Sequence, residues 1–147
     1  MTKRLLTTIL TTLLTAIGLQ AASSFTNVKL TVSGMTVTMS NGKTTIKIGS
    51  NGRASSMKWG SRELLDGSNG IYFDYTTAQG NKALSPTELK IIKQTDEMCE
   101  VLYSATSGNT IFQQGYIMRN DIAGVYTYVI ATGTATSASE PLKEVRV

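Results

Sequence analysis

Gly49 to Tyr75 (GSNGRASSMKWGSRELLDGSNGIYFDY) is the stretch of the chain that decides the fold. Asn51-Gly52 is a pair suited to the positive φ angles of a tight hairpin turn. The next segment, Arg53–Trp59, alternates between two faces and predicts a short strand, with Trp59 as its large aromatic anchor. A second predicted strand, Ile71–Tyr75, follows a turn rich in glycine and polar residues. The stretch therefore predicts a β-meander that leaves little room for helix.

The same alternation continues through most of the chain. A second hairpin pair, Asn41-Gly42, separates two alternating segments, and Ala78–Ser85 is polar and turn-like. In all, about nine or ten short strands are predicted at a spacing of about 8 to 12 residues, which is typical of an all-β fold, an antiparallel β-sandwich. The other segments with strand-like alternation are Val28–Val32, Thr36–Ser40, Thr44–Ile48, Thr87–Lys93, Glu97–Thr106, Thr110–Arg119, Val125–Thr132 and Pro141–Val147.

The beginning of the chain has the layout of a secretory signal peptide. Lys3-Arg4 is a short positive start, Leu5–Leu19 is apolar and rich in threonine, and small residues follow from Ala21. The apolar run is shorter than the about 20 residues that a transmembrane helix needs. We therefore expect residues 1–21 to be removed and residues 25–147 to form one β-sandwich domain. The mature protein is expected to be secreted or periplasmic, with no membrane anchor.

The charge balance gives no support to nucleic-acid binding. The sequence carries 14 basic and 10 acidic residues, and two of the basic ones, Lys3 and Arg4, lie in the predicted leader. The remainder has no basic run and no basic stripe interleaved with aromatic residues. A length of 147 residues with 41% hydrophobic residues suits one folded domain.

Residue types that carry much of enzyme chemistry are scarce. The chain has no histidine and one cysteine, so a Ser-His-Asp arrangement cannot be built and a zinc site is not expected. Cys99 alternates within a predicted strand and is expected to be a buried structural thiol. Asp66 and Asp74 are candidates for the carboxylate pair of a glycosidase, although a turn Asp and a strand-end Asp are the simpler roles. Arg119 and Arg146, near the ends of two predicted strands, are the candidate cations for a carboxylate ligand.

The last predicted strand stops at Val147 without a turn or a polar tail. A strand that ends in this way leaves a row of backbone groups unpaired. From this pattern we expect the chain to be the front piece of a longer protein, with a sandwich incomplete at its C-terminus. The alternative is a natural strand terminus.

Three segments, taken in order, resemble the front of the rhamnogalacturonan lyases of polysaccharide lyase family 4. Asn51–Leu65 resembles the family pattern N-G-x-[hydrophobic or small]-[ST]-S-[hydrophobic]-x-x-x-G/S-x-E-L-L, which is followed by a glycine-rich turn and an aromatic strand. Gly115–Tyr128 looks like the family's stretch in which a hydrophobic strand and a loop ending in glycine lead to G-[hydrophobic]-Y-x-Y. Glu140–Arg146 is similar to the place where the family keeps Glu-x-Arg. The resemblance covers roughly Val28 to the end of the chain.

This resemblance implies a galactose-mutarotase-like sandwich, or supersandwich, and β-elimination in the rhamnose–galacturonate backbone of pectin. The implied partner is an acidic polysaccharide, rhamnogalacturonan I, and we expect no cofactor, no metal and a monomer. On the family pattern, Arg146 matches the arginine that contacts substrate. The family's catalytic lysine and histidine have no counterparts here, so the resemblance implies that the catalytic residues lie beyond Val147 and that this chain alone is inactive.

Three alternatives remain open. A non-catalytic carbohydrate-binding or adhesin-type sandwich would be complete without further residues. A relative of the aldose mutarotases would need histidines in its cleft, and this chain has none. A generic structural sandwich would keep Trp59, Tyr126 and Tyr128 in its core, whereas sugar-stacking aromatics expose one face.

Overall fold

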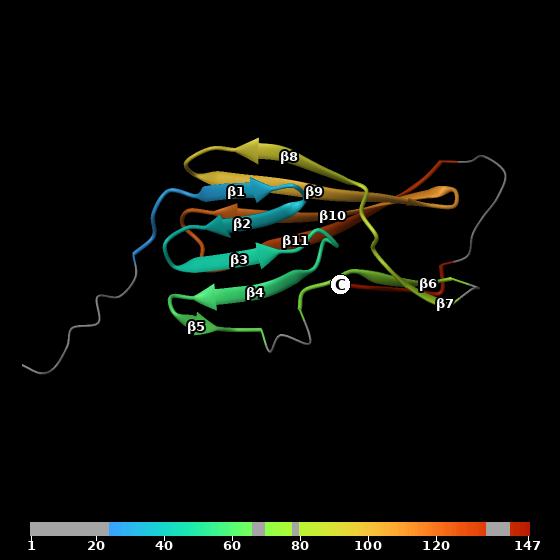
Figure 1. Ribbon diagram of the computed structural model, residues 1–147, viewed down its shortest axis with the longest axis horizontal. Coiled ribbons are helices and arrows are strands. Elements are labelled where there is room, and N and C mark those ends of the chain that lie inside the picture. The colour runs from blue at the N-terminus through green and yellow to red at the C-terminus, as the bar shows by residue number, and fades with distance from the viewer. Residues whose placement is uncertain (1–23, 66–69, 78–79, 135–141) are drawn as a thin grey trace, which may run out of the picture.

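The computed structural model describes residues 24–65, 70–77, 80–134 and 142–147. The predicted signal peptide, the turn that contains Asp66 and most of the loop before Pro141 lie outside these residues. In the described ranges every regular element is a strand, and the twelve strands form three antiparallel sheets (Figure 1). None of these ranges contains a helix long and apolar enough to cross a membrane.

The first sheet is a meander of five strands that pair in sequence order. Its middle strands alternate as the sequence predicts, because Val37, Met39, Ile46 and Ile48 are fully buried between polar neighbours. The predicted hairpin between them turns at Gly42, whose φ is 84°. The strands are β1 (Lys29–Ser33), β2 (Thr36–Ser40), β3 (Thr44–Ile48), β4 (Ala54–Trp59) and β5 (Arg62–Glu63).

The second sheet has four strands in the order β11-β10-β9-β8. Its two central strands are ten residues each and join at a tight turn in which Gly108 has a φ of 57°. Because they are long, they extend past the first sheet, so they pack against it along one part and against the third sheet along the rest. The strands are β8 (Glu88–Gln94), β9 (Met98–Ser107), β10 (Thr110–Arg119) and β11 (Tyr126–Gly133).

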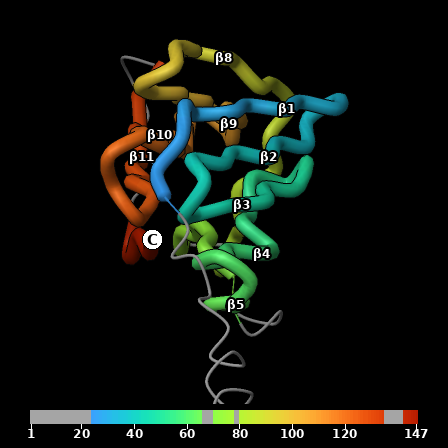
Figure 2. The backbone as a smooth tube through the Cα atoms, turned by 90° about the vertical axis from the view of Figure 1, so that its left-hand side faces the viewer, coloured from blue at the N-terminus to red at the C-terminus, as the bar shows by residue number. Residues whose placement is uncertain are grey.

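The first two sheets form two layers with the main core between them (Figure 2). Two fully buried tyrosines of the second sheet, Tyr103 and Tyr116, lie edge to face with 6.3 Å between ring centroids. Each hydroxyl crosses to the backbone on the other side of the core: Tyr103 donates to the Met35 carbonyl (2.9 Å) and Tyr116 to the Gly52 carbonyl (2.7 Å). The hydroxyls satisfy carbonyls that would otherwise be costly to bury, so they fix how the layers meet.

The third sheet covers the far ends of β9 and β10 (Figure 1). Its order is β12-β6-β7, with bounds β6 (Asp74–Thr77), β7 (Gly80–Ala83) and β12 (Glu144–Arg146). The contact is aromatic: Tyr75 stacks on Phe112 of β10 at 4.1 Å between centroids, and Phe73 lies 5.6 Å from the same ring. Stacking and apolar burial therefore attach this sheet to the body of the sandwich.

The predicted all-β antiparallel sandwich is confirmed, with three corrections. The strand expected from Ile71 begins only at Asp74, because Ile71 makes a single bridge to Ala54 and the chain then leaves the first sheet. The stretch expected to be a turn contains β7. Trp59 is not an anchor of the core: it is 53% exposed, because it precedes the Gly60 turn at the end of an edge hairpin.

Candidate functional site

The candidate site lies where two parts of the Gly49–Tyr75 stretch cross. The first part is a tight turn in which Gly52 has a φ of 76° and its N–H donates to the Gly49 carbonyl (3.0 Å). Only glycine adopts this φ without strain. The Asn51 side-chain oxygen accepts the N–H of Arg53 (3.1 Å), which fixes the backbone of the arginine that follows the turn.

The second part, Gly70 to Tyr72, passes directly against the first. The N–H of Ala54 donates to the Ile71 carbonyl (2.8 Å). A Cβ on Gly70 would lie 2.0 Å from the Ala54 carbonyl oxygen, so only glycine permits this approach. The Tyr116 hydroxyl, which donates to Gly52, also lies 3.4 Å from the Ile71 carbonyl oxygen. Burial raises the pKa of Tyr116, so this hydroxyl keeps its proton. It contacts both parts of the crossing from the core side.

Two hollows open on either side of the crossing. The larger, of about 520 Å³, is lined by the turn, by Thr36 and Ser55, and by Gly70. The smaller, of about 350 Å³, is lined by the 70–72 segment, Thr127 and Val147. Gly70 lines both, so the two hollows adjoin at the crossing, and together they are called the groove below.

Arg53 and Tyr72 stand at this junction. The Arg53 guanidinium carbon lies 4.9 Å from the centroid of the Tyr72 ring, a cation–π contact, and both side chains are half-buried. Arg53 lines the larger hollow and Tyr72 the smaller one. Among the described residues, no carboxylate lies within ion-pair distance of Arg53.

Arg146, the substrate-contacting residue implied by the resemblance, sits on β12 opposite Asp74 of β6. The two side chains form a bidentate ion pair, with Nε donating to Oδ1 (2.7 Å) and Nη2 to Oδ2 (2.9 Å). The hydrogen bond to Asp74 raises the pKa of Arg146 above its ordinary value. The Arg146 side chain is 42% exposed and that of Asp74 17%. The neighbouring Val147 lines the smaller hollow, and the role of Arg146 toward substrate stays a prediction.

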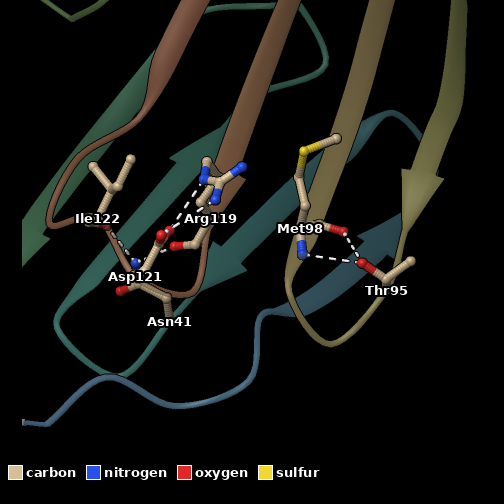
Figure 3. A network of polar contacts seen from close by, with 6 residues as sticks. All are labelled: Asn41, Thr95, Met98, Arg119, Asp121 and Ile122. Atoms are coloured by element: carbon tan, nitrogen blue, oxygen red, sulfur yellow. Dashed lines mark hydrogen bonds and ion pairs between the residues drawn. The ribbon is translucent and has the colours of Figure 1, made fainter.

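Arg119, the other candidate cation, is part of a structural network (Figure 3). Its guanidinium donates twice to Asp121, at 3.0 and 3.2 Å. Asn41 inserts its amide below the same loop, and Nδ2 donates to the Arg119 and Ile122 carbonyls (2.7 and 2.8 Å). Because Asn41 is fully buried and comes from the β2–β3 turn, it ties the first sheet to the loop after β10.

The Ser and Glu of the Asn51–Leu65 motif form hydrogen bonds within the hairpin of β4 and β5. The Ser56 hydroxyl donates to Glu63 Oε2 (2.6 Å), and the N–H of Met57 donates to Oε1 (2.8 Å). The bond from Ser56 is the largest of the contacts that lower the pKa of Glu63. Glu63 is therefore held ionised as an acceptor, which is unsuited to a general acid.

The remaining candidates are settled by burial. Cys99 is fully buried, and burial raises the pKa of its thiol to about 11, so the predicted structural role is confirmed. Tyr126 is 52% exposed, and Tyr128 is half-buried over Gly115, whose missing side chain leaves room for the ring. With Trp59 also exposed, these aromatics are not the core of a generic sandwich.

The candidate carboxylate pair is not brought together among the described residues. Asp74 forms an ion pair with Arg146, and Asp66, the other predicted member of the pair, lies outside the described residues. No group of three potential metal ligands occurs in the described part of the chain.

Sequence reasoning missed Arg53 and Tyr72 as site residues. Both lie inside the segment that carries the resemblance, but a strand pattern assigns them only alternating faces. The signal that could have found them is the Asn-Gly turn directly before Arg53, since a rigid turn presents the next side chain in a defined direction.

The chain is similar to part of one known enzyme. No family model matches the chain. It is 31% identical, over 92% of its length, to the rhamnogalacturonate lyase of Dickeya dadantii (strain 3937). The chain spans 25% of the length of that enzyme, so it is a partial homologue of a lyase.

Proposed function

We propose, from this partial homology, that the chain is the substrate-binding front part of a lyase that cleaves the rhamnose–galacturonate backbone of rhamnogalacturonan I. The observation that carries the proposal is 31% identity to a rhamnogalacturonate lyase across 92% of the chain. The groove at the crossing supports it, because its hydroxyl and amide groups, its arginine and its aromatic ring are the groups that hold an acidic sugar.

The proposed reaction is a β-elimination that breaks the bond to O4 of a galacturonate. A base removes the proton on C5, which lies next to the carboxylate, the C4–O4 bond breaks, and an acid delivers a proton to the departing oxygen. The electron pair of the C5–H bond becomes the C4–C5 double bond of an unsaturated uronate. The C5 proton is acidic enough only if the negative charge of the carboxylate is offset by a cation.

In this proposal Arg146 contacts the substrate with the donors that Asp74 leaves free. A guanidinium carries five N–H donors, and Asp74 engages two of its nitrogens. The Asp74 carboxylate already balances its charge, so Arg146 is suited to hydrogen-bonding sugar hydroxyls. The residue that follows it, Val147, lines the smaller hollow.

The base and the acid are proposed to come from the three-quarters of the relative's length that this chain does not match. The chain itself has no histidine. Among its carboxylates, Glu63 and Asp74 are committed to hydrogen bonds or ion pairs within the fold. We propose that the chain alone binds without cleaving. We further propose that residues 1–21 direct export, so that the protein meets pectin outside the cytoplasm.

The test measures binding and cleavage separately. The full chain is titrated with an oligosaccharide of alternating rhamnose and galacturonate, and the ultraviolet absorbance of unsaturated uronate is followed in the same sample. The expected result is saturable binding with no new absorbance. A rise in absorbance would contradict the placement of the catalytic groups, and a folded chain that binds no acidic oligosaccharide would contradict the binding role.

A hybrid tests the lyase assignment itself. In it, this chain replaces the matching quarter of the Dickeya enzyme, and the native enzyme is the positive control. The proposal expects the folded hybrid to release unsaturated product. A folded hybrid that binds the oligosaccharide but never cleaves it would favour the non-catalytic carbohydrate-binding alternative.

A further inference from the structure

We infer that Arg53, stacked on Tyr72, binds the carboxylate of a galacturonate and gives the groove its preference for acidic over neutral sugars. The inference rests on the proposed function for the identity of the polysaccharide. It adds a specificity-determining residue that neither the sequence motifs nor the homology assigns.

Arg53 differs from Arg119 and Arg146 in its ion pairing. Arg119 and Arg146 each form a bidentate ion pair with an aspartate of the fold. Arg53 has no carboxylate at ion-pair distance in the described part of the chain, and its guanidinium lies at the groove. A half-buried cation with no carboxylate partner among the described residues attracts an anion more strongly than a pair that is already neutral.

The fold also pre-organises Arg53 for this task. The Gly52 carbonyl before it is held by the buried Tyr116 hydroxyl, and its own N–H is held by Asn51. The Tyr72 ring restrains the planar guanidinium by stacking. Because backbone and side chain are both restrained, little conformational freedom remains to be lost when a carboxylate binds.

The surroundings suit a sugar rather than a small free anion. Beside Arg53, the larger hollow is lined by Thr36, Ser50, Asn51 and Ser55, whose hydroxyl and amide groups can donate to and accept from ring hydroxyls. Across Gly70 the groove continues into the hollow lined by Tyr72 and Thr127. Consecutive sugars of one chain can therefore occupy the two hollows, with the carboxylate of one at Arg53.

The experiment compares two ligands: the rhamnose–galacturonate oligosaccharide and the same molecule with its carboxyl groups reduced to alcohols. Wild type is expected to prefer the acidic form. Arg53→Gln should weaken binding of the acidic form by about tenfold or more and leave the reduced form nearly unchanged, which removes the preference. The matched control is Arg62→Gln, which removes an exposed arginine of the same sheet that also has no described ion pair.

A second variant separates Arg53 from the ion pair. Asp74→Asn combined with Arg146→Gln removes one charge of each sign, so the net charge is unchanged. This double variant should bind both ligands less well but keep the preference for the acidic form. Thermal unfolding of each variant shows that it is folded.

The outcomes distinguish the two proposals. If wild type binds neither ligand, the proposed function fails. If wild type prefers the acidic ligand and folded Arg53→Gln keeps that preference, the role of Arg53 is overturned while the proposed function stands. Loss of the preference in the double variant would also overturn it, because the selecting charge would then be Arg146.

Discussion

The crossing of the turn at Gly52 with the 70–72 segment and the β12 edge use arginine in opposite ways. At the crossing, buried contacts from Tyr116 and the close approach at Gly70 hold the backbone, and Arg53 has no carboxylate partner among the residues that the structure describes. At the edge, β12 has three residues, all exposed, and Arg146 is engaged with Asp74 across the strand pair. Where buried contacts already hold the backbone, an arginine can remain available to bind a ligand. A short exposed strand such as β12 instead depends on the ion pair of its arginine to stay attached to the sheet.

The most damaging change to the crossing is Gly70→Ala. Its Cβ would lie 2.0 Å from the Ala54 carbonyl oxygen, a backbone atom that cannot rotate away. We expect a loss of about 3 kcal/mol in the free energy of unfolding, at the upper end for an overpacked site. Gly133→Ala is the control, since its Cβ would have no neighbour within 4 Å. Denaturant unfolding measures both, and equal stability of the two variants would refute the close approach.

Tyr116→Phe removes the hydroxyl without changing the packing of the ring. The Gly52 carbonyl then loses its buried donor, which should cost about 2 kcal/mol in unfolding free energy. Tyr126→Phe, at an exposed ring, is the matched control. Should the two variants unfold at the same denaturant concentration, the hydroxyl would not be holding the crossing.

Asp74→Asn tests whether the ion pair holds the edge. With the two-pronged bond weakened, β12 should open more often, and the Lys143 N–H that donates to the Thr76 carbonyl should exchange with deuterium several-fold faster. The melting temperature should fall less than in Tyr116→Phe, because the pair is partly exposed to water. Unchanged exchange at Lys143 would mean that the backbone ladder alone retains the strand.

The smallest expected effect is the pH dependence of the Arg119–Asp121 pair. The hydrogen bond from Arg119 lowers the pKa of Asp121 below its ordinary 3.8. A carboxyl with a lowered folded pKa contributes stability above its unfolded pKa and loses that contribution as the pH falls through the folded pKa. Asp121→Asn should therefore lower the melting temperature slightly at neutral pH and have no effect well below pH 3.8. A difference that persists in strong acid would assign the effect to something other than the charge.

The sequence was sufficient for features that depend on local periodicity. Alternation placed β10 at its observed bounds and put Cys99 on the buried face, because a period of two decides which side chains point inward. It also predicted Asn41-Gly42 as a turn. It could not show that the Asn41 amide reaches the loop after β10, since that contact joins residues 78 and 81 positions apart.

The site depended on packing between distant segments, and that is why most of it was not predicted. Trp59 looks like an anchor by composition, but it lies at the end of an edge hairpin and is 53% exposed. Arg146 is a candidate from its place in a predicted strand and from the resemblance, but its partner Asp74 is 72 positions away in the chain and neither signal indicates the pair. Tyr72 and Arg53 meet only because Gly70 lets two backbones touch.

The most direct test of the account observes the arginine side chains themselves during binding. Nitrogen–proton NMR spectra resolve the Nε–H groups of Arg53, Arg62 and Arg146 after assignment with single variants. On titration with the rhamnose–galacturonate oligosaccharide, the Arg53 Nε–H should shift furthest and sharpen as exchange with water slows, while that of Arg146 stays near its Asp74-bound position. A shift confined to Arg146, with Arg53 unmoved at saturation, would contradict the account.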